Sequence, residues 1–193
     1  VLTASGQVYL YRYWHDEQLV SELIQQRLQS MPVVDVDGLK DAFSDWTSSQ
    51  VGIDWQKVAV MMALSRQLSV ISGGPGTGKT TIVLRLLQLL LQQDKSVRIA
   101  LAAPTGKAAA RLQQAIPEQG ALAVEAKTIH RLLGITSDND KGRYHADKPL
   151  PVDVLIVDEA SMIDISLMAT IMKALPRHAR LVLLGDSDQS VSY

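Results

Sequence analysis

Short apolar runs alternate with longer amphipathic segments along most of the chain. The runs predict buried strands near residues 69–72, 97–102, 154–157 and 181–184. The amphipathic segments, whose apolar residues recur every three or four positions, predict helices near residues 56–67, 78–93, 107–115 and 167–175. Strands that are apolar throughout and are separated by helices are typical of a parallel sheet covered on both faces. The pattern therefore predicts an α/β fold from about residue 51 onward.

The first 50 residues follow a different pattern. β-Favouring residues at Val8–Tyr13 predict a short strand, and Asp16 is the expected start of a helix. The apolar face of that helix would contain Leu19, Leu23, Ile24 and Leu28. A second short helix is expected where the same spacing is repeated by Leu39, Phe43 and Trp46. We therefore divide the chain into a small accessory or subunit-contact region at 1–50 and an α/β domain at 51–193.

The net charge of −1 narrows the ways in which the chain can bind nucleic acid. It excludes a uniformly basic surface, so any contact with nucleic acid must be local.

The absence of cysteine excludes disulfides and thiolate metal sites, and the four histidines lack ligand spacing, so no zinc site is expected. No apolar stretch approaches the ~20 residues that span a bilayer, and the start lacks signal-peptide features. We therefore expect a cytoplasmic protein without a membrane partner.

The segment Gly73–Thr80 fits the phosphate-loop pattern at every defined position. Its glycines let the backbone curl until N–H groups point at phosphate oxygens, and the following helix adds its positive end. Lys79 would bring a charge to the β- and γ-phosphates, and the Thr80 hydroxyl would ligate Mg²⁺. A flexible Gly/Pro turn is the alternative, but an apolar strand precedes the loop and a helical run follows it. The residues expected to bind the nucleotide here are Gly74, Pro75, Gly76, Thr77, Gly78, Lys79, Thr80 and Thr81.

Two carboxylates follow the predicted strand at 154–157. An aspartate at the carboxyl end of a parallel strand lies beside the phosphate loop, so Asp158 is expected to hold Mg²⁺ through water. Glu159 is placed to orient and deprotonate the attacking water. A solvated acidic turn is the alternative interpretation. The Asp-Glu pair favours an ATPase over a GTPase, and the chain has no Asn-Lys-x-Asp sequence that would read guanine.

Two glutamines are weaker candidates for nucleotide contacts. Gln189 follows the last predicted strand, where an amide could sense the γ-phosphate, although the preceding residues 185–188 also favour a simple turn. Gln56 is expected just before the first helix of the α/β domain and could hydrogen-bond an adenine edge, but a surface glutamine is the simpler interpretation. The candidate catalytic residues are therefore Lys79, Asp158, Glu159 and Gln189.

Nucleic-acid contacts are predicted at two places. Thr105 leaves a strand end and opens a helix, so its hydroxyl and the neighbouring N–H groups could grip a backbone phosphate, with Lys107 and Arg111 on one face of that helix. Thr128 and His130 belong to a second cluster of donors. Helix capping and solvated charge explain both places equally well. Three tyrosines on one face of the first predicted strand would suit base stacking, but packing or a subunit contact is favoured: Tyr9, Tyr11 and Tyr13.

The segments that carry these candidates stand in a fixed order: Gln56, ISGGPGTGKTT, AAPTGKAAARL, TIHRLLG, LIVDEASMID and LLGDSDQ. Together they resemble the motifs of superfamily-one helicases, and they are most similar to the RecD family, the α chain of bacterial exodeoxyribonuclease V. The resemblance implies an ATP- and Mg²⁺-dependent 5′-to-3′ helicase on single-stranded DNA, built on a RecA-like P-loop NTPase domain. It also implies RecB-like and RecC-like partner subunits, in a complex that unwinds and degrades duplex ends.

The resemblance assigns a role to each matching position. Gln56 would read adenine, and Gln189 would couple the nucleotide state to movement. Phosphate binding, Mg²⁺ binding and hydrolysis would fall to Lys79, Thr80, Asp158 and Glu159. DNA contacts would fall to Thr105, Lys107, Thr128 and His130.

The chain departs from the family after Gln189, where a second RecA-like domain with an arginine finger is expected. The stretch between Leu112 and Thr128 is also short for the family, so either the chain is truncated or loops are missing from it. An isolated first domain should hydrolyse ATP weakly, because such an arginine contributes about 10³–10⁵ in rate. The alternatives are a stand-alone RecD-like helicase, a P-loop ATPase that acts on RNA or protein clients, and an assembly module that docks a partner through residues 1–50.

Overall fold

The computed structural model describes most of the chain. The described residues are 1, 8, 10–30, 32, 43, 46, 53–74, 76–116, 124–139 and 142–186. The second short helix predicted at 39–46 falls largely outside them, as do Pro75 and Gln189. Of that predicted helix the structure places Phe43 and Trp46, whose rings stack with their centroids 5.8 Å apart.

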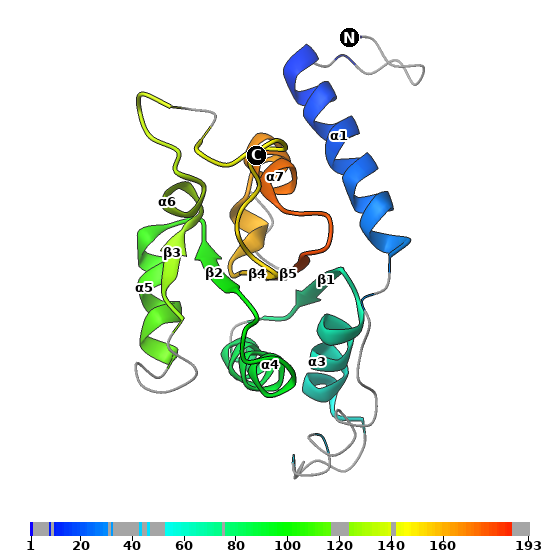
Figure 1. The fold of residues 1–193 in the computed structure, drawn as a ribbon, viewed down its shortest axis with the longest axis vertical. Helices are drawn as coiled ribbons and strands as arrows, with labels where there is room; N and C mark the ends of the chain where they lie inside the picture. The colour runs from blue at the N-terminus through cyan, green and yellow to red at the C-terminus, as the bar shows by residue number, and fades with distance from the viewer. Residues whose placement is uncertain are drawn as a thin grey trace.

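Five parallel strands form one sheet in the described part of the chain (Figure 1). Their bounds are β1 Leu68–Ser72, β2 Ile99–Ala103, β3 Ala126–Thr128, β4 Val154–Val157 and β5 Arg180–Gly185. The strand order is β1-β5-β4-β2-β3. Because all the strands run the same way, their carboxyl ends meet at one edge of the sheet. The predicted α/β fold with a parallel sheet is confirmed.

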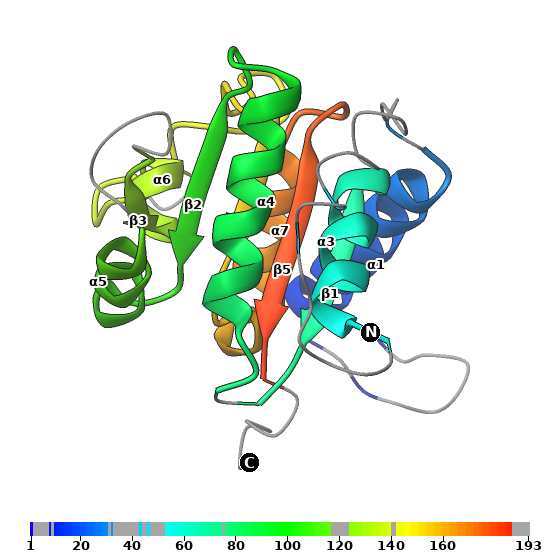
Figure 2. The same cartoon turned by 90° about the horizontal axis from the view of Figure 1, so that it is seen from below.

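Helices cover both faces of the sheet. Their bounds are α1 Tyr11–Leu28, α3 Trp55–Ser65, α4 Lys79–Gln93, α5 Gly106–Ala115, α6 Ile129–Leu133 and α7 Ile165–Ala174, with a 3-10 turn, η1, at Ala160–Met162. Figure 2 shows α3 and α4 in front of the sheet, α7 behind it and α5 beside β3. None of the described helices is long and apolar enough to cross a bilayer.

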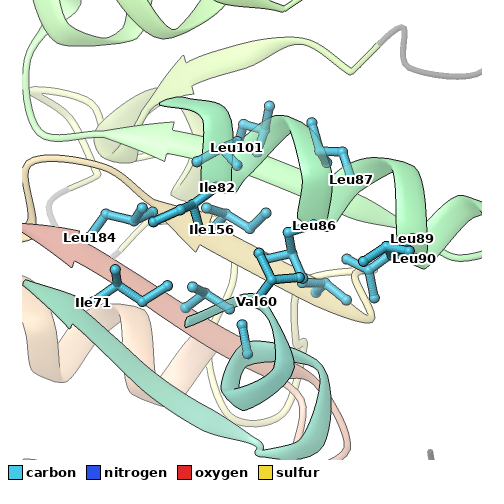
Figure 3. Close-up of a cluster of buried hydrophobic side chains, with 14 of the residues drawn as sticks. Val60, Ile71, Ile82, Leu86, Leu87, Leu89, Leu90, Leu101, Ile156 and Leu184 are labelled. Carbon is cyan, nitrogen blue, oxygen red and sulfur yellow. The ribbon is translucent and has the colours of Figure 1, made fainter. Parts of the chain in front are cut away.

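Two large apolar cores lie between the helices and the sheet in the described part of the chain, and a small cluster of alanines lies between β2 and α5. On one side, α3 and α4 pack against the sheet through residues that include Val60, Leu86, Leu87, Ile156 and Leu184 (Figure 3). On the other side, α6 and α7 pack against the sheet through residues that include Ile129, Leu155, Val157, Ile171 and Leu181. Successive side chains of a strand point to opposite faces of the sheet. Because helices cover both faces, β4 is buried at every position. Burial of each large apolar side chain contributes about 1.5–3 kcal/mol to the stability of the fold. The packed sheet is therefore a rigid support for the residues at the carboxyl ends of its strands.

The strand predicted at Val8–Tyr13 is wrong, because α1 begins at Tyr11. The ring centroids of Tyr11 and Trp14 lie 6.3 Å apart, a contact between residues three apart that helical spacing makes possible. Packing of α1 on α7 overrides the modest β preference of tyrosine. Tyr11 and Tyr13 are therefore helical and do not share the face of a strand, and Tyr9 lies outside the described residues.

The predicted helix start at Asp16 is also wrong, because this residue lies inside α1. Its carboxylate accepts a hydrogen bond from Ser166 Oγ of α7 at 2.7 Å. Leu23 and Ile24 of the predicted apolar face pack against the second core, whereas Leu28 is exposed. The apolar face of this helix was therefore predicted in part, but its start was not.

Arg27 binds the end of α1 to the turn that follows α7 through hydrogen bonds. Its side chain is buried, and its guanidinium donates hydrogen bonds to the carbonyls of Ala179 at 2.8 Å and of Leu175 and Pro176 at 3.2 Å each. Some of these carbonyls lie at the negative end of α7, which a cation stabilises. Burial lowers the pKa of Arg27, but an arginine keeps its charge in proteins. α1 thus packs as a layer of the α/β domain, and a division at residue 50 stays a prediction.

Replacing Arg27 by methionine should lower the free energy of unfolding by about 2–4 kcal/mol, because it leaves three carbonyls without their donor in a buried place. Urea denaturation followed by circular dichroism measures the change. Arg12→Met, on an exposed position of the same helix, is the matched control and should change the stability by less than about 0.5 kcal/mol. Equal midpoints for both variants would contradict this role of Arg27.

A charged cluster joins the starts of β2 and β4 at the opposite edge of the sheet. Arg98 donates to the Asp153 carboxylate through Nη2 at 2.7 Å and Nε at 3.0 Å, and His178 Nε2 lies 3.2 Å from the same carboxylate. These hydrogen bonds, above all those from Arg98, hold the pKa of Asp153 well below its usual range. A cavity of about 870 Å³ between α1 and the turn after α7 opens beside this cluster. Both features lie away from the carboxyl edge that carries the predicted site.

Candidate active site

The loop between β1 and α4 curls as the sequence predicts. Gly76 has φ 79° and Gly78 has φ 85°, both in the left-handed region that favours glycine. A Cβ atom at Gly73 would lie 2.7 Å from Thr77 Oγ1, and a Cβ atom at Gly78 would collide with the side-chain amide of Gln56. Larger residues at these positions would therefore open the loop.

The amino end of α4 leaves its backbone N–H groups available to an anion. Gly78 caps the helix without a side-chain hydrogen bond, and the first turn contains no acidic residue. A helix end of this kind binds anions through its unpaired N–H groups and its positive dipole. Thr80 and Thr81 are exposed in this turn. The start of α4 therefore fits a phosphate group with hydroxyls beside it.

The Lys79 ammonium lies between the carboxyl ends of β1 and β5. It donates to the carbonyl of Gly73, and it lies 3.5 Å from the carbonyl oxygen of Gly74 and 3.4 Å from that of Gly185. The Gly73 N–H donates to the Gly185 carbonyl at 3.2 Å, so β5 also holds the start of the loop. Carbonyl oxygens thus keep the cation at the loop, where phosphate oxygens can replace them as its partners.

Asp158 and Glu159 follow β4 on the same edge of the sheet. The Asp158 N–H donates to the Ala102 carbonyl at 2.9 Å, and the Glu159 N–H donates to Asp158 Oδ1 at 2.9 Å. Glu159 has φ 52° and ψ 37°, and it is the one non-glycine residue with positive φ in the described part of the chain. Such a conformation costs about 1–3 kcal/mol and occurs often at functional sites. The turn sets the direction of the Glu159 side chain.

β5 lies between the phosphate-loop strand β1 and the acidic strand β4. Gly185 at its end contacts both sides: its carbonyl binds the loop, and a Cβ atom on it would lie 3.4 Å from the Ser161 nitrogen. Asp158 and the loop therefore share an edge of the sheet and are one strand apart. The sequence predicted the shared edge but not the intervening strand, and the catalytic roles of the acids stay predictions.

The residues at this edge suit Mg²⁺ in the way that nucleotide sites usually hold it. Thr80 offers a hydroxyl oxygen and Asp158 a carboxylate oxygen. Among the described residues no three His, Cys, Asp or Glu side chains gather into a metal cage. Mg²⁺ commonly binds one or two carboxylates and takes its other ligands from water and substrate phosphates. The donors present fit a metal that arrives with a nucleotide.

Gln56 lies against the phosphate loop. It is in the first turn of α3, where its N–H donates to the side chain of the N-cap Asp54 at 3.0 Å. Its Nε2 donates to the Thr77 carbonyl at 3.2 Å. The structure therefore places Gln56 in contact with the candidate site. A surface glutamine without a role there would have no reason to make this contact. Adenine recognition stays a prediction, and Gln189 lies outside the described residues.

The two predicted nucleic-acid segments leave neighbouring strands, because the register pairs Ala103 of β2 with Thr128 of β3. Thr105 caps α5 and Thr128 caps α6, each by accepting a hydrogen bond from a backbone N–H at 3.2 Å. The capping interpretation is therefore right for both hydroxyls, which still have a hydrogen to donate. Lys107 and His130 are exposed close to these caps.

A cavity of about 550 Å³ opens between α5 and β3. Lys127 and Arg131 line it, and their side chains pair with Glu125 at 3.0 and 3.8 Å. The hydrogen bond from Lys127 is the main reason that the pKa of Glu125 is lowered. Local positive charge is thus present where the sequence predicts a nucleic-acid contact, although Glu125 offsets part of it.

Comparison with known protein families decides the class of this site. The AAA domain family matches residues 56–193, a range that includes the phosphate loop and the acidic pair. The chain belongs to this family. Membership in the AAA domain family, together with the loop geometry, makes the chain a nucleotide-binding domain, as the sequence predicts.

RecD proteins are among the relatives of this AAA domain. The chain is 41% identical over 207 residues to the RecBCD enzyme subunit RecD of Haemophilus influenzae, an alignment that covers 97% of this chain and 32% of that protein. It is 35% identical over 191 residues to the ATP-dependent RecD2 DNA helicase of Deinococcus radiodurans, which covers 97% of this chain and 25% of that protein. The predicted resemblance to the RecD family is confirmed. The chain spans a third or less of the length of these relatives.

The fold is shared with a solved helicase structure. The UvsW helicase from Bacteriophage T4 superposes with a TM-score of 0.58 and 11% sequence identity, over 98% of this chain and 76% of that one. At this identity the likeness concerns the fold alone. It agrees with the predicted α/β fold, a parallel sheet flanked by helices.

Proposed function

We propose that this chain is the first motor domain of an ATP-dependent DNA helicase subunit of the RecD type. ATP hydrolysis would drive movement along single-stranded DNA and unwind duplex ends during recombinational repair, within an exodeoxyribonuclease V-type complex. The observation that supports this most is that Lys79 and the Asp158–Glu159 pair share one rigid sheet edge with Thr105 and Thr128. Nucleotide and nucleic acid bound along one edge can be coupled by small movements.

The proposed chemistry uses the groups at this edge in distinct ways. Lys79 and the N–H groups at the start of α4 offset the charge of the β- and γ-phosphates. The Thr80 hydroxyl would bind Mg²⁺ and the Asp158 carboxylate would hold it through water, and the metal would supply further positive charge to the phosphates. Glu159 accepts the proton of the attacking water. Adenine recognition and sensing of the γ-phosphate are proposed for Gln56 and Gln189.

Partners follow from the same proposal. RecB-like and RecC-like subunits are proposed because the Haemophilus influenzae relative is named a subunit of the RecBCD enzyme. Residues 1–50 would form a subunit-contact region and 51–193 the motor domain, with the arginine that completes the site on a second motor domain. Exposed side chains near the start of α1 offer an apolar contact surface for a subunit: Leu10, Tyr11 and Tyr13. We propose the bacterial cytoplasm as the location, as suits a DNA-unwinding enzyme of this kind.

A stand-alone helicase is the second candidate function. It is favoured by the relative from Deinococcus radiodurans, which is named an ATP-dependent RecD2 DNA helicase and is not named as a subunit. Size-exclusion chromatography of the protein purified from its own cells distinguishes a subunit from a stand-alone helicase, because a subunit co-elutes with the other chains of its complex. An ATPase that acts on RNA or protein is the third candidate, and it is tested by comparing the ATP hydrolysis that each substrate stimulates.

The full-length protein should hydrolyse ATP faster with single-stranded DNA than with RNA of the same sequence. Its affinity for DNA should fall steeply with salt, because phosphate contacts release counterions. ATP should be required for the displacement of a strand from a duplex with a 5′ tail, and a 3′ tail should not support it. Equal stimulation by RNA and DNA, or preference for the 3′ tail, would contradict the proposed function.

A further inference from the structure

Arg111 connects the candidate nucleic-acid segment to the candidate hydrolytic acid. It lies on the exposed face of α5, one helical turn beyond Lys107. Its Nη1 lies 4.0 Å from Glu159 Oε1, so the two side chains form an ion pair between α5 and the turn after β4. α5 follows β2, and β2 pairs directly with β4. The contact therefore crosses from the nucleic-acid end of the edge to the nucleotide end.

The backbone at Glu159 presents its carboxylate to α5. Its left-handed conformation starts the turn η1, and the Asp158 carboxylate holds the turn by accepting the Glu159 N–H. A glutamate in this conformation carries strain that is stable only where the surroundings impose it. The side-chain contact with Arg111 is thus made by a residue whose direction the fold determines, and not by a freely rotating surface acid.

The ion pair is weak enough to be exchanged. The Arg111 side chain is 67% exposed and the Glu159 side chain 31%, and exposed pairs of this kind contribute about 0–1 kcal/mol. A guanidinium binds a phosphate through two parallel hydrogen bonds, which is a stronger interaction than a single contact at this distance. α5 has no acidic residue of its own, so its exposed face offers two cations, Lys107 and Arg111, to an approaching phosphate.

We propose that Arg111 is a positioning residue that couples nucleic-acid binding to ATP hydrolysis. Without nucleic acid, its ion pair occupies the Glu159 carboxylate and holds it toward α5. A backbone phosphate that reaches α5 takes over the guanidinium and frees the carboxylate to accept the proton of the attacking water. This inference rests on the proposed function and adds a regulatory contact to the same site.

The test measures ATP turnover of the full-length protein with and without single-stranded DNA. Arg111→Gln should raise turnover without DNA by about two- to fivefold, the factor that corresponds to an exposed ion pair. The stimulation by DNA should fall by at least the same factor, and KM for ATP should stay unchanged. Arg111→Lys, which keeps the charge, should lie between the unmodified protein and Arg111→Gln.

The dependence of ATP turnover on ionic strength distinguishes the proposed role of Arg111 from a purely structural one, which would leave this dependence unchanged. Salt screens exposed charges more strongly as the Debye length shortens. Turnover of the unmodified protein without DNA should therefore rise with moderate salt, whereas turnover of Arg111→Gln should not. Arg177→Gln is the matched control, because Arg177 is an exposed arginine in the turn between α7 and β5, at the opposite edge of the sheet. It should behave as the unmodified protein does.

The outcomes separate this inference from the proposed function. The inference is overturned if Arg111→Gln leaves the stimulation ratio unchanged, or if it lowers turnover equally with and without DNA. In both cases ATP hydrolysis that depends on Lys79 and is stimulated by DNA would still support the proposed function. If the unmodified protein shows no such hydrolysis, the proposed function fails first.

Discussion

Replacing Lys79 by alanine is expected to abolish measurable nucleotide binding. The ammonium is held by carbonyls at the ends of β1 and β5, where two phosphates of a nucleotide would compete for it. A hydrogen bond to a charged group contributes about 1.5–3 kcal/mol, so loss of contacts to two phosphates should weaken binding by more than about 100-fold. Titration of the protein with a fluorescent ATP analogue measures the change.

Lys95→Ala is the matched control for this experiment. Lys95 is exposed in the turn between α4 and β2, at the far end of α4 from the loop. Its substitution should leave nucleotide affinity within about twofold, as expected for a surface position away from the site. Thermal unfolding of both variants checks that the fold is kept. An unchanged affinity in folded Lys79→Ala would show that the loop is not a phosphate site.

Replacing Glu159 by glutamine is expected to stop hydrolysis and keep nucleotide binding. The amide has the size of the carboxylate but cannot accept the proton of the attacking water. General-base catalysis contributes about 10²–10⁴ in rate, so turnover in the full-length protein should fall by that factor, while the affinity for ATP stays within a few-fold. Single-turnover hydrolysis of radiolabelled ATP separates the chemical step from binding.

Glu22→Gln on α1 is the control for the glutamate substitution. Glu22 is exposed on the helix, where it accepts a hydrogen bond from Gln26 at 3.1 Å, and it lies on a different element from the site. Its turnover should match that of the unmodified protein. If Glu159→Gln loses ATP binding together with turnover, the carboxylate has a structural role at the turn. Unchanged turnover would remove Glu159 as the base.

Several elements followed directly from local pattern. The strand predicted at 154–157 has those bounds in the structure, and the helix predicted at 107–115 begins one residue earlier, at Gly106. The strand is a short continuous apolar run, and the helix repeats its buried apolar positions at helical spacing, so both are visible in a short window of sequence. The residues of the phosphate loop were predictable for a different reason, since the curl requires glycine at defined positions whatever surrounds it.

Other elements could not be obtained from local pattern. β3 has three residues and α6 has five, too few to establish a period, and their positions depend on pairing with β2. The start of α1 was missed because tyrosines favour strands, whereas packing on α7 makes them helical. No pattern marked Arg27 as buried, because an arginine at a helix end is normally solvated.

The sequence alone determined the chemical groups of the candidate site and the strands and helices that carry them, because residue type and short spacing are sufficient for a glycine loop, a lysine and a carboxylate pair. Only the tertiary structure decided that β5 separates the loop from the acids, that Gln56 touches the loop and that Arg111 meets Glu159. These contacts join residues far apart in the chain. They depend on the order in which strands associate and on how helices pack over them, which no local stretch of residues specifies.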